Sequence, residues 1–283
     1  MAAGAGLAPH RFTLDSGVLR SNMPTERLCL ALAQAAAVPG DVDANVAAVV
    51  AAVSAAAIRG ANLVVFPELF LTGYELAHLE STKDAWLEEH DPRLDPVRRA
   101  CARGGVTAIL GAALQTRGGD RHIAAPIVGP SGDIGFSLKE HLHGSETRLF
   151  QPGAAIPPFT VHGWRVAIGI CFDVAWPEHA ANAALDGTDL YVASALYSRG
   201  EERRSDLHLG ARAMDNRVFS GLANFAGSTG GHVSCGLSGA WGPNGDVLER
   251  ARGADEALVV VELEPSQLEA YRRREPTSSG QGD

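Results

Sequence analysis

The sequence lacks an excess of basic residues: 24 Lys and Arg stand against 33 Asp and Glu, and the formal net charge is −9. This balance leaves no broad basic surface for nucleic acid or for an anionic membrane. Residues 1–22 contain no continuous apolar core of the kind a signal peptide needs, and no later run reaches the roughly 18 apolar residues of a transmembrane helix. We therefore expect a cytoplasmic protein that binds neither nucleic acid nor membrane.

Cysteine is scarce, and its four copies lie far apart in the chain. They form no CxxC pair and no Cys/His spacing that suits zinc, so reduced thiols are expected. Cys29, Cys101 and Cys235 are interpreted as small buried apolar side chains. Cys171 requires a separate explanation because of the segments on either side of it.

Other site motifs are missing or incomplete. Neither GxSxG nor GxxxxGK[ST] occurs, so the defining residues of a serine-hydrolase elbow and of a P-loop are absent. His141 and His143 form an HxH pair, but no third ligand stands at a sensible spacing. The sequence therefore predicts no metal site.

The apolar content of the sequence is high enough for one large domain. Hydrophobic residues make up 46% of the 283 residues, so the chain can bury a large core. Residues 1–25 are rich in Gly, Ala and Ser without an apolar period and are interpreted as a loose leader, with Met23 a candidate start just before the first predicted strand. The domain is placed at 26–265, and residues 266–283 are expected to form a short helix and a polar tail.

Apolar runs and helical periods alternate through the first half of the chain. The pattern predicts a buried strand at 27–34, a long helix at 41–59 and a second strand at 62–66. A strand, helix, strand order indicates a parallel pair with the helix on one face. Further elements are then expected, namely a helix at 91–103, a strand at 106–114, and a hairpin of 122–129 with 134–138.

The second half repeats this alternation. Residues 164–170 and 189–195 are predicted strands, with a helix at 177–185 between them. A helix near 205–218 and a strand-rich region up to residue 263 follow. The expected class is α/β with a mixed sheet.

Three ionisable or nucleophilic side chains stand at the ends of predicted strands, where α/β sheets present their active groups. Glu68 follows the strand at 62–66, Lys139 closes the hairpin, and Cys171 lies between a strand and the helix opened by Pro177. Taken singly, each has a plainer interpretation: a surface carboxylate, a solvated lysine and a buried strand-end thiol. The residues by themselves leave this choice open.

Three segments together resemble the signature of the nitrilase superfamily of carbon–nitrogen hydrolases. ANLVVFPELFLTGY (61–74) is similar to its glutamate motif, LKEHL (138–142) to its lysine motif, and GICFDVAWPEHA (169–180) to its cysteine motif. The chain order Glu, Lys, Cys and the spacing also match. Three agreeing segments are more specific than any single motif, and the likeness covers about residues 27–263.

The resemblance implies a role for each of five residues. Glu68 would be the general base, Cys171 the attacking thiol, and Lys139 the stabiliser of the tetrahedral intermediate. Glu146 matches the position of the family's second, supporting glutamate, and the backbone N–H of Phe172 is the natural second oxyanion donor. The chemistry is consistent, because a thiol with a pKa near about 8.5 is mostly protonated at neutral pH and needs a base.

The resemblance also implies a reaction and an architecture. An amide-like carbon would be attacked, ammonia or an amine would leave as a thioester forms, and water would hydrolyse the thioester, with no cofactor. The fold implied is a four-layer α-β-β-α sandwich of the nitrilase type, with subunits paired in a homodimer or a higher homo-oligomer. Asp215-Asn216 stands where the family has Glu-Asn, so the local support of the site is expected to differ.

The leading interpretation is an amidase or N-carbamoyl hydrolase whose partner is a small amide, urea or nitrile. A true nitrilase is less favoured, because Phe172-Asp173 follow the cysteine where nitrile-cleaving members more often resemble Trp-Glu. The alternatives are amide-forming acyl transfer through the same thioester and a non-catalytic binding or regulatory subunit. For the substrate pocket, the candidates are Tyr74, His143, Trp176, Ala195 and Tyr197. Packing in the core or at the rim is the plainer interpretation of Trp176 and Tyr197.

Overall fold

The computed structural model describes residues 23–274. The predicted leader at 1–25 lies outside these residues except for Met23, Pro24 and Thr25, and the end of the predicted tail lies outside them as well. The proposed domain boundaries therefore stay predictions.

The first β-sheet contains seven strands in the order β15-β1-β2-β3-β5-β4, with β6 paired to β5. The pairs β1–β2 and β2–β3 are parallel, whereas the other pairs are antiparallel. Helices connect the parallel strands, as such pairs require. The strands are β1 (Leu28–Gln34), β2 (Leu63–Val65), β3 (Thr107–Ile109), β4 (Ala112–Gln115), β5 (Arg121–Val128), β6 (Ile134–Leu138) and β15 (Ala257–Leu263).

The second β-sheet contains six strands in the order β14-β13-β10-β9-β8-β7. Its central strands β8, β9 and β10 are parallel to one another. A separate ribbon pairs β11 (Ser228–Thr229) with β12 (His232–Val233). The sheet strands are β7 (Phe159–Val161), β8 (Trp164–Ile170), β9 (Leu190–Ser194), β10 (Phe219–Ala223), β13 (Gly239–Trp241) and β14 (Val247–Arg250).

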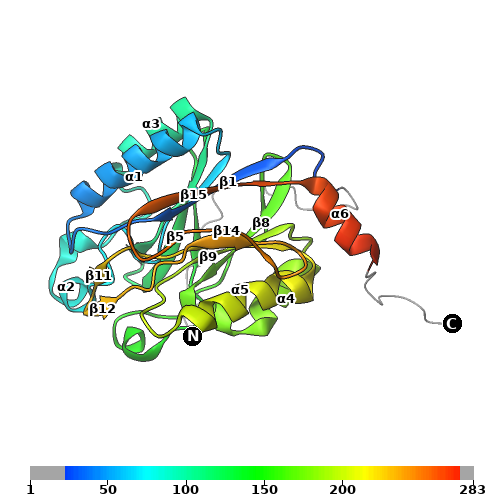
Figure 1. Ribbon diagram of the computed structural model, residues 1–283. Helices are drawn as coiled ribbons and strands as arrows, with labels where there is room; N and C mark the ends of the chain where they lie inside the picture. The colour runs from blue at the N-terminus through cyan, green and yellow to red at the C-terminus, as the bar shows by residue number, and fades with distance from the viewer. Residues whose placement is uncertain (1–22, 275–283) are drawn as a thin grey trace, which may run out of the picture.

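Helices cover the outer faces of the two sheets, so the molecule has four layers (Figure 1). On the first sheet α1 packs beside α3, and on the second sheet α4 packs beside α5. This arrangement confirms the α-β-β-α sandwich that the family resemblance implies. The helices are α1 (Val42–Ile58), α2 (Leu76–Ser81), α3 (Asp95–Gly104), α4 (Pro177–Leu185), α5 (Glu202–Asn216) and α6 (Pro265–Arg274).

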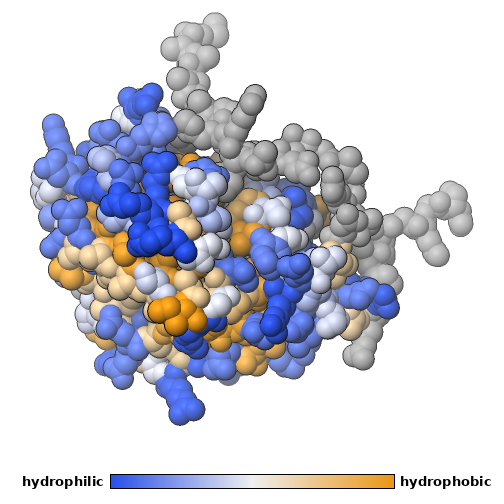
Figure 2. All heavy atoms as spheres, turned by 90° about the horizontal axis from the view of Figure 1, so that it is seen from above, coloured by the Kyte–Doolittle hydropathy of each residue, from blue (hydrophilic) through white to orange (hydrophobic). Residues whose placement is uncertain are grey.

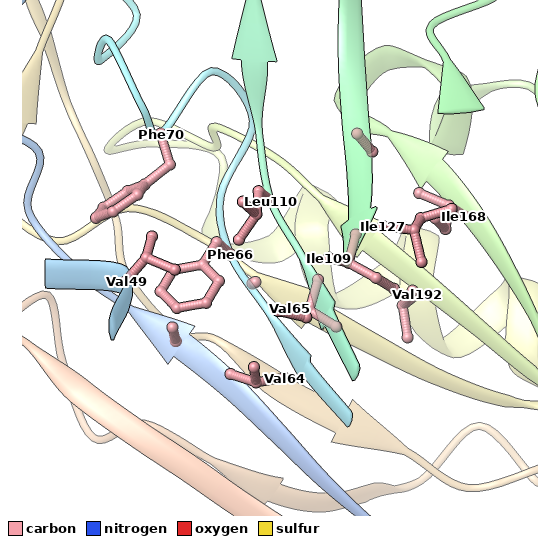
Figure 3. Close-up of a cluster of buried hydrophobic side chains, with 14 of the residues drawn as sticks. Val49, Val64, Val65, Phe66, Phe70, Ile109, Leu110, Ile127, Ile168 and Val192 are labelled. Atoms are coloured by element: carbon pink, nitrogen blue, oxygen red, sulfur yellow. The ribbon is translucent and has the colours of Figure 1, made fainter. Parts of the chain in front are cut away.

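The apolar core between the sheets holds them together. Val65 and Ile127 come from the first sheet, Ile168 and Val192 come from the second, and all four are almost fully buried (Figure 3). Burying one such side chain contributes about 1.5–3 kcal/mol. The strand ends of the two sheets are therefore fixed relative to one another.

The strand predicted at 106–114 is wrong in one respect: it is two strands, β3 and β4, separated at Gly111. Gly111 lies against the turn that follows β2, where an added Cβ would come within 2.0 Å of the Pro67 carbonyl oxygen. The Leu71 N–H also donates to the Gly111 carbonyl at 3.0 Å. The sequence does not reveal this break between β3 and β4, because it is associated with contacts to residues 67–71, which are distant in the chain.

The surface seen from above is mainly hydrophilic, with smaller apolar patches between the polar side chains (Figure 2). Exposed apolar residues include Ile58 at the end of α1 and Leu185 at the end of α4. Single exposed apolar side chains of this kind are common in folded proteins. Over residues 23–274, no helix has both the length and the apolar character needed to cross a bilayer.

Candidate active site

Three polar side chains meet at one edge of the sandwich, where strands of both sheets end. Glu68 lies in the turn after β2, Lys139 directly follows β6, and Cys171 directly follows β8. Lys139 Nζ donates to Glu68 Oε1 at 2.6 Å, and both side chains are fully buried. Two residues that would each pass for a surface charge thus form one buried ion pair.

Glu146 is the second carboxylate on the lysine. It lies in the 3-10 helix Gly144–Arg148, and both of its oxygens accept from Lys139 Nζ at 2.8 Å. The Tyr74 hydroxyl donates to Glu146 Oε1, and the His143 N–H donates to Oε2 at 2.7 Å. These bonds fix the carboxylate and, through it, the ammonium group.

Cys171 occupies a strained turn between β8 and α4. Its φ is +47°, a left-handed conformation that residues other than glycine rarely adopt. The 3-10 helix Cys171–Ala175 begins here, and the first N–H groups of a helix have no partner within it. The Phe172 N–H is therefore placed to donate to a group beside the thiol, whose Sγ lies 3.8 Å from the Leu196 carbonyl oxygen.

Asp173 ties the cysteine turn to the lysine segment. Its buried carboxylate accepts from the Ile170 N–H at 3.0 Å and from the His141 N–H at 2.8 Å. These donors stand one residue before Cys171 and two residues after Lys139, so Asp173 fixes the thiol relative to the cation. In the sequence Asp173 stands out only as a difference from nitrile-cleaving proteins, although a carboxylate two residues after a strand-end thiol is a local signal of such a contact.

Ser194 joins the two sheets beside the base. It ends β9, is fully buried, and donates to the Phe66 carbonyl oxygen at 2.8 Å. Phe66 precedes Glu68 by two residues, so this bond holds the second sheet against the turn that carries the carboxylate. Ser194 was not predicted as a site residue, because contacts between distant strand ends leave no local pattern in the sequence.

Glu68 is suited to accept a proton near neutral pH. Burial, opposed by the Lys139 cation and aided by Glu146, raises the pKa of its carboxyl to about 7. Its Oε2 is buried and has no hydrogen-bond partner in the described part of the chain. A general base needs a pKa near the working pH and a free oxygen, and Glu68 has both.

The resting site combines a neutral thiol with an ammonium group. Burial, reinforced by the carboxylate of Glu68, raises the pKa of the Cys171 thiol well above its usual range. Burial alone would lower the pKa of Lys139, but the carboxylates around it outweigh that effect and raise its pKa. Near neutral pH the thiol is therefore protonated and the lysine is charged.

A cavity of about 440 Å³ opens over these groups. Glu68, Glu146 and Cys171 line its buried end, and Phe172 and Leu196 contribute apolar wall. Its outer part is lined by basic, acidic and imidazole side chains from the segment after β9, from α5 and from the β11–β12 ribbon: Arg199, Glu201, Arg204, His208 and His232. The space suits a small molecule whose reacting carbon lies next to the thiol.

Three of the five predicted pocket residues line this cavity, namely Tyr74, His143 and Tyr197. Ala195 and Trp176 are not part of its wall. Ala195 is fully buried, and its N–H donates to the Ala223 carbonyl at 3.0 Å. Trp176 turns outward with 45% of its surface exposed and stacks on His141, with 4.6 Å between ring centroids.

The two histidines of the HxH pair turn toward different neighbours. His141 Nδ1 lies 3.0 Å from Asp173 Oδ1, whereas the His143 ring lies 4.9 Å from the Phe172 ring. Within residues 23–274, no group of three or more His, Cys, Asp or Glu side chains is arranged to hold a metal ion. The two imidazoles therefore do not converge on one point.

The Asp215-Asn216 pair lies on α5, away from the cavity wall. Asp215 is exposed, and Asn216 Nδ2 donates within the helix to the Arg212 carbonyl at 2.9 Å. Arg212 connects the helix to the cysteine turn, because its Nε donates to the Val174 carbonyl at 3.0 Å. The shorter side chain at 215 leaves this connection in place.

Comparison with known proteins gives matches along nearly the whole described chain. The model of a family described as carbon-nitrogen hydrolase matches residues 29–273. The chain is 31% identical over 249 residues to an (R)-stereoselective amidase of Pseudomonas sp. (86% of this chain, 87% of that protein). It is 30% identical over 207 residues to a nitrilase of Pyrococcus abyssi (73% and 78%). It also resembles a solved variant of the amidase from Nesterenkonia sp. AN1 that carries the acetamide moiety of fluoroacetamide on its active-site cysteine (TM-score 0.77, 26% identity, 92% and 97% covered).

Proposed function

The chain belongs to the carbon–nitrogen hydrolase family, and we propose that it cleaves a small amide or N-carbamoyl compound through a thioester at Cys171. The observation that carries this proposal is the buried Glu68–Lys139–Glu146 network beside a thiol that lines a cavity. Relatives support it, since one is an amidase and another forms a covalent adduct at its active-site cysteine.

In the first half of the reaction, the Cys171 sulfur attacks the amide carbon and its proton passes to Oε2 of Glu68. The carbonyl oxygen becomes negatively charged and accepts hydrogen bonds from Lys139 Nζ and the Phe172 N–H. The C–N bond then breaks, and the proton on Glu68 moves to the leaving nitrogen. Ammonia or an amine departs, and a thioester remains.

In the second half, the carboxylate of Glu68 takes a proton from water as the water oxygen attacks the thioester carbon. The same two donors stabilise the second oxyanion. The C–S bond breaks, the acid product leaves, and the proton returns from Glu68 to the Cys171 sulfur. Glu146 keeps the ammonium group in place through both halves.

The experiment is a screen of amides, ureas and nitriles for ammonia release, followed by intact-mass analysis during turnover. Cys171→Ala should abolish turnover and the acyl adduct, while Cys29→Ala, a thiol outside the cavity wall, should keep both. An adduct on another cysteine, or more than about a hundredth of the wild-type rate in Cys171→Ala, would contradict covalent catalysis by this thiol.

A further inference from the structure

Charged side chains at the outer end of the cavity mostly neutralise one another. Arg204 donates to Glu201 Oε1 at 2.9 Å, and Glu201 Oε2 accepts from the Ser198 N–H at 2.9 Å. His208 Nδ1 lies 3.1 Å from the Tyr197 hydroxyl, and burial lowers the pKa of this imidazole, so it is neutral near pH 7. These groups leave no free charge at this part of the wall.

Arg199 is different, because its guanidinium is exposed on the cavity wall without an ion-pair partner in the part of the chain that the structure describes. Its backbone is fixed, since the Arg199 N–H donates to the Val233 carbonyl of β12 at 2.8 Å. The exposed Glu202 is the carboxylate nearest in charge effect, but backbone N–H groups, including that of Gly200 at 2.9 Å, are the main cause of its lowered pKa, and the Arg199 cation contributes less. A guanidinium to which no carboxylate is paired among residues 23–274 therefore stands at the cavity mouth.

The buried end of the cavity has the opposite character. Glu68 and Glu146 lie there beside Cys171, and a second anion next to them would be repelled. Phe172 and Leu196 supply apolar wall that suits an aliphatic spacer. A molecule with an amide at one end and an anion at the other would therefore enter with its amide toward the thiol.

We infer that the substrate carries a carboxylate on the side away from the scissile bond, and that Arg199 binds this carboxylate. The inference rests on the proposed function for the nature of the reacting end. Arginine suits the task because its paired N–H donors match the two oxygens of a carboxylate. A cation at the mouth also attracts an anion that the rest of this protein, with its formal net charge of −9, repels.

Binding to a protein that cannot turn over tests this inference separately from catalysis. In the Cys171→Ala background, calorimetry gives Kd for succinamate, glutaramate and adipamate, and for butyramide, valeramide and hexanamide as neutral amides of equal length. We expect at least one acid to bind about tenfold more tightly than its neutral counterpart, the lower end of what a hydrogen bond to a charged group contributes.

Two further variants assign the effect to one side chain. Adding Arg199→Gln should bring the ratio of the two Kd values to within about twofold of one. Arg203→Gln is the matched control, because Arg203 is exposed on α5 but is not part of the cavity wall. It should keep the full ratio.

Equal binding of every acid and its neutral counterpart, including no detectable binding of either, would overturn the assignment. A preference for the acid that survives Arg199→Gln would overturn it as well. Hydrolysis is measured separately: a wild-type protein that releases ammonia from no amide counts against the proposed function. An amidase with no preference for acids counts against the carboxylate site alone.

Discussion

Substitutions at Lys139 can distinguish the contribution of its positive charge to the rate from the contribution of its position in the site. Its Nζ lies 2.6 Å from Glu68 Oε1 and 2.8 Å from each oxygen of Glu146, and the side chain is fully buried. Lys139→Arg keeps the charge, but the wide planar guanidinium cannot place one compact donor at the oxyanion. We expect kcat to fall at least about a hundredfold, the scale of one lost oxyanion donor, roughly 2.7–4 kcal/mol.

Lys139→Ala removes the charge as well, and its cost should depend on pH. Glu68 and Glu146 would face each other without a cation, and breaking such a buried pair costs about 3–5 kcal/mol. Burial already raises the pKa of Glu68 to about 7, and the variant would lack the Lys139 cation that lowers it. Stability is lost as pH rises through this raised pKa, so the deficit should be largest above about pH 7 and shrink toward about pH 5.

The measurements are initial rates on the amide found by screening and urea unfolding at about pH 5 and pH 8. Lys83→Ala, at an exposed lysine, is the control for loss of a positive charge elsewhere. Near-normal kcat in Lys139→Arg would mean that the lysine acts only as a diffuse charge, and its oxyanion role would be abandoned. Equal destabilisation of Lys139→Ala at both pH values would refute the argument from paired carboxylates.

Three further predictions concern the Asp173 carboxylate, the close contact at Gly111 and the pH dependence of the rate. Asp173→Asn should lower kcat about tenfold or more, because the single amide oxygen cannot accept from both backbone N–H groups that now bond to the two carboxylate oxygens. Initial rates measured together with a thermal melt distinguish a loss of activity from unfolding, and an unchanged kcat would contradict the role given to Asp173. Gly111→Ala should destabilise the fold, since the added Cβ would come within 2.0 Å of the Pro67 carbonyl oxygen. Gly118→Ala is the control and should leave stability unchanged, because its Cβ would lie 3.6 Å from the nearest atom, Thr116 Oγ1. Melting temperatures of the two variants from circular dichroism give the comparison. Finally, kcat/KM should rise with pH through about 7 as the Glu68 carboxyl loses its proton and becomes a base, and a flat profile between about pH 5 and 8 would argue against that role.

Much of the fold could be predicted from the sequence because local patterns encode it. The apolar runs before Glu68, Lys139 and Cys171 became β2, β6 and β8, close to the expected ranges. The helix predicted at 41–59 became α1 (Val42–Ile58). The ends of these three strands were therefore predicted to within one residue, and so were the positions of Glu68, Lys139 and Cys171 beyond them.

Features set by contacts between distant segments could not be predicted in this way. The split at Gly111 depends on the turn around Pro67, which an unbroken apolar run does not reveal. Trp176 was one candidate for the pocket, with packing the plainer interpretation, and in the structure it stacks on His141. Arg199 was not identified from the sequence, since its place on the cavity wall is a property of the folded chain.

Because the site is divided between two sheets, the apolar core between them also fixes the relative position of the site residues. Glu68 and Lys139 follow strands of one sheet, Cys171 follows a strand of the other, and the Ser194 hydroxyl joins the two at 2.8 Å beside the base. A slip of about 1 Å between the sheets would cost on the order of a hundredfold in rate. Substitutions in the apolar layer between the sheets can therefore abolish the activity while the protein stays folded. Folded but inactive variants should thus cluster in the layer between the sheets as well as around the thiol.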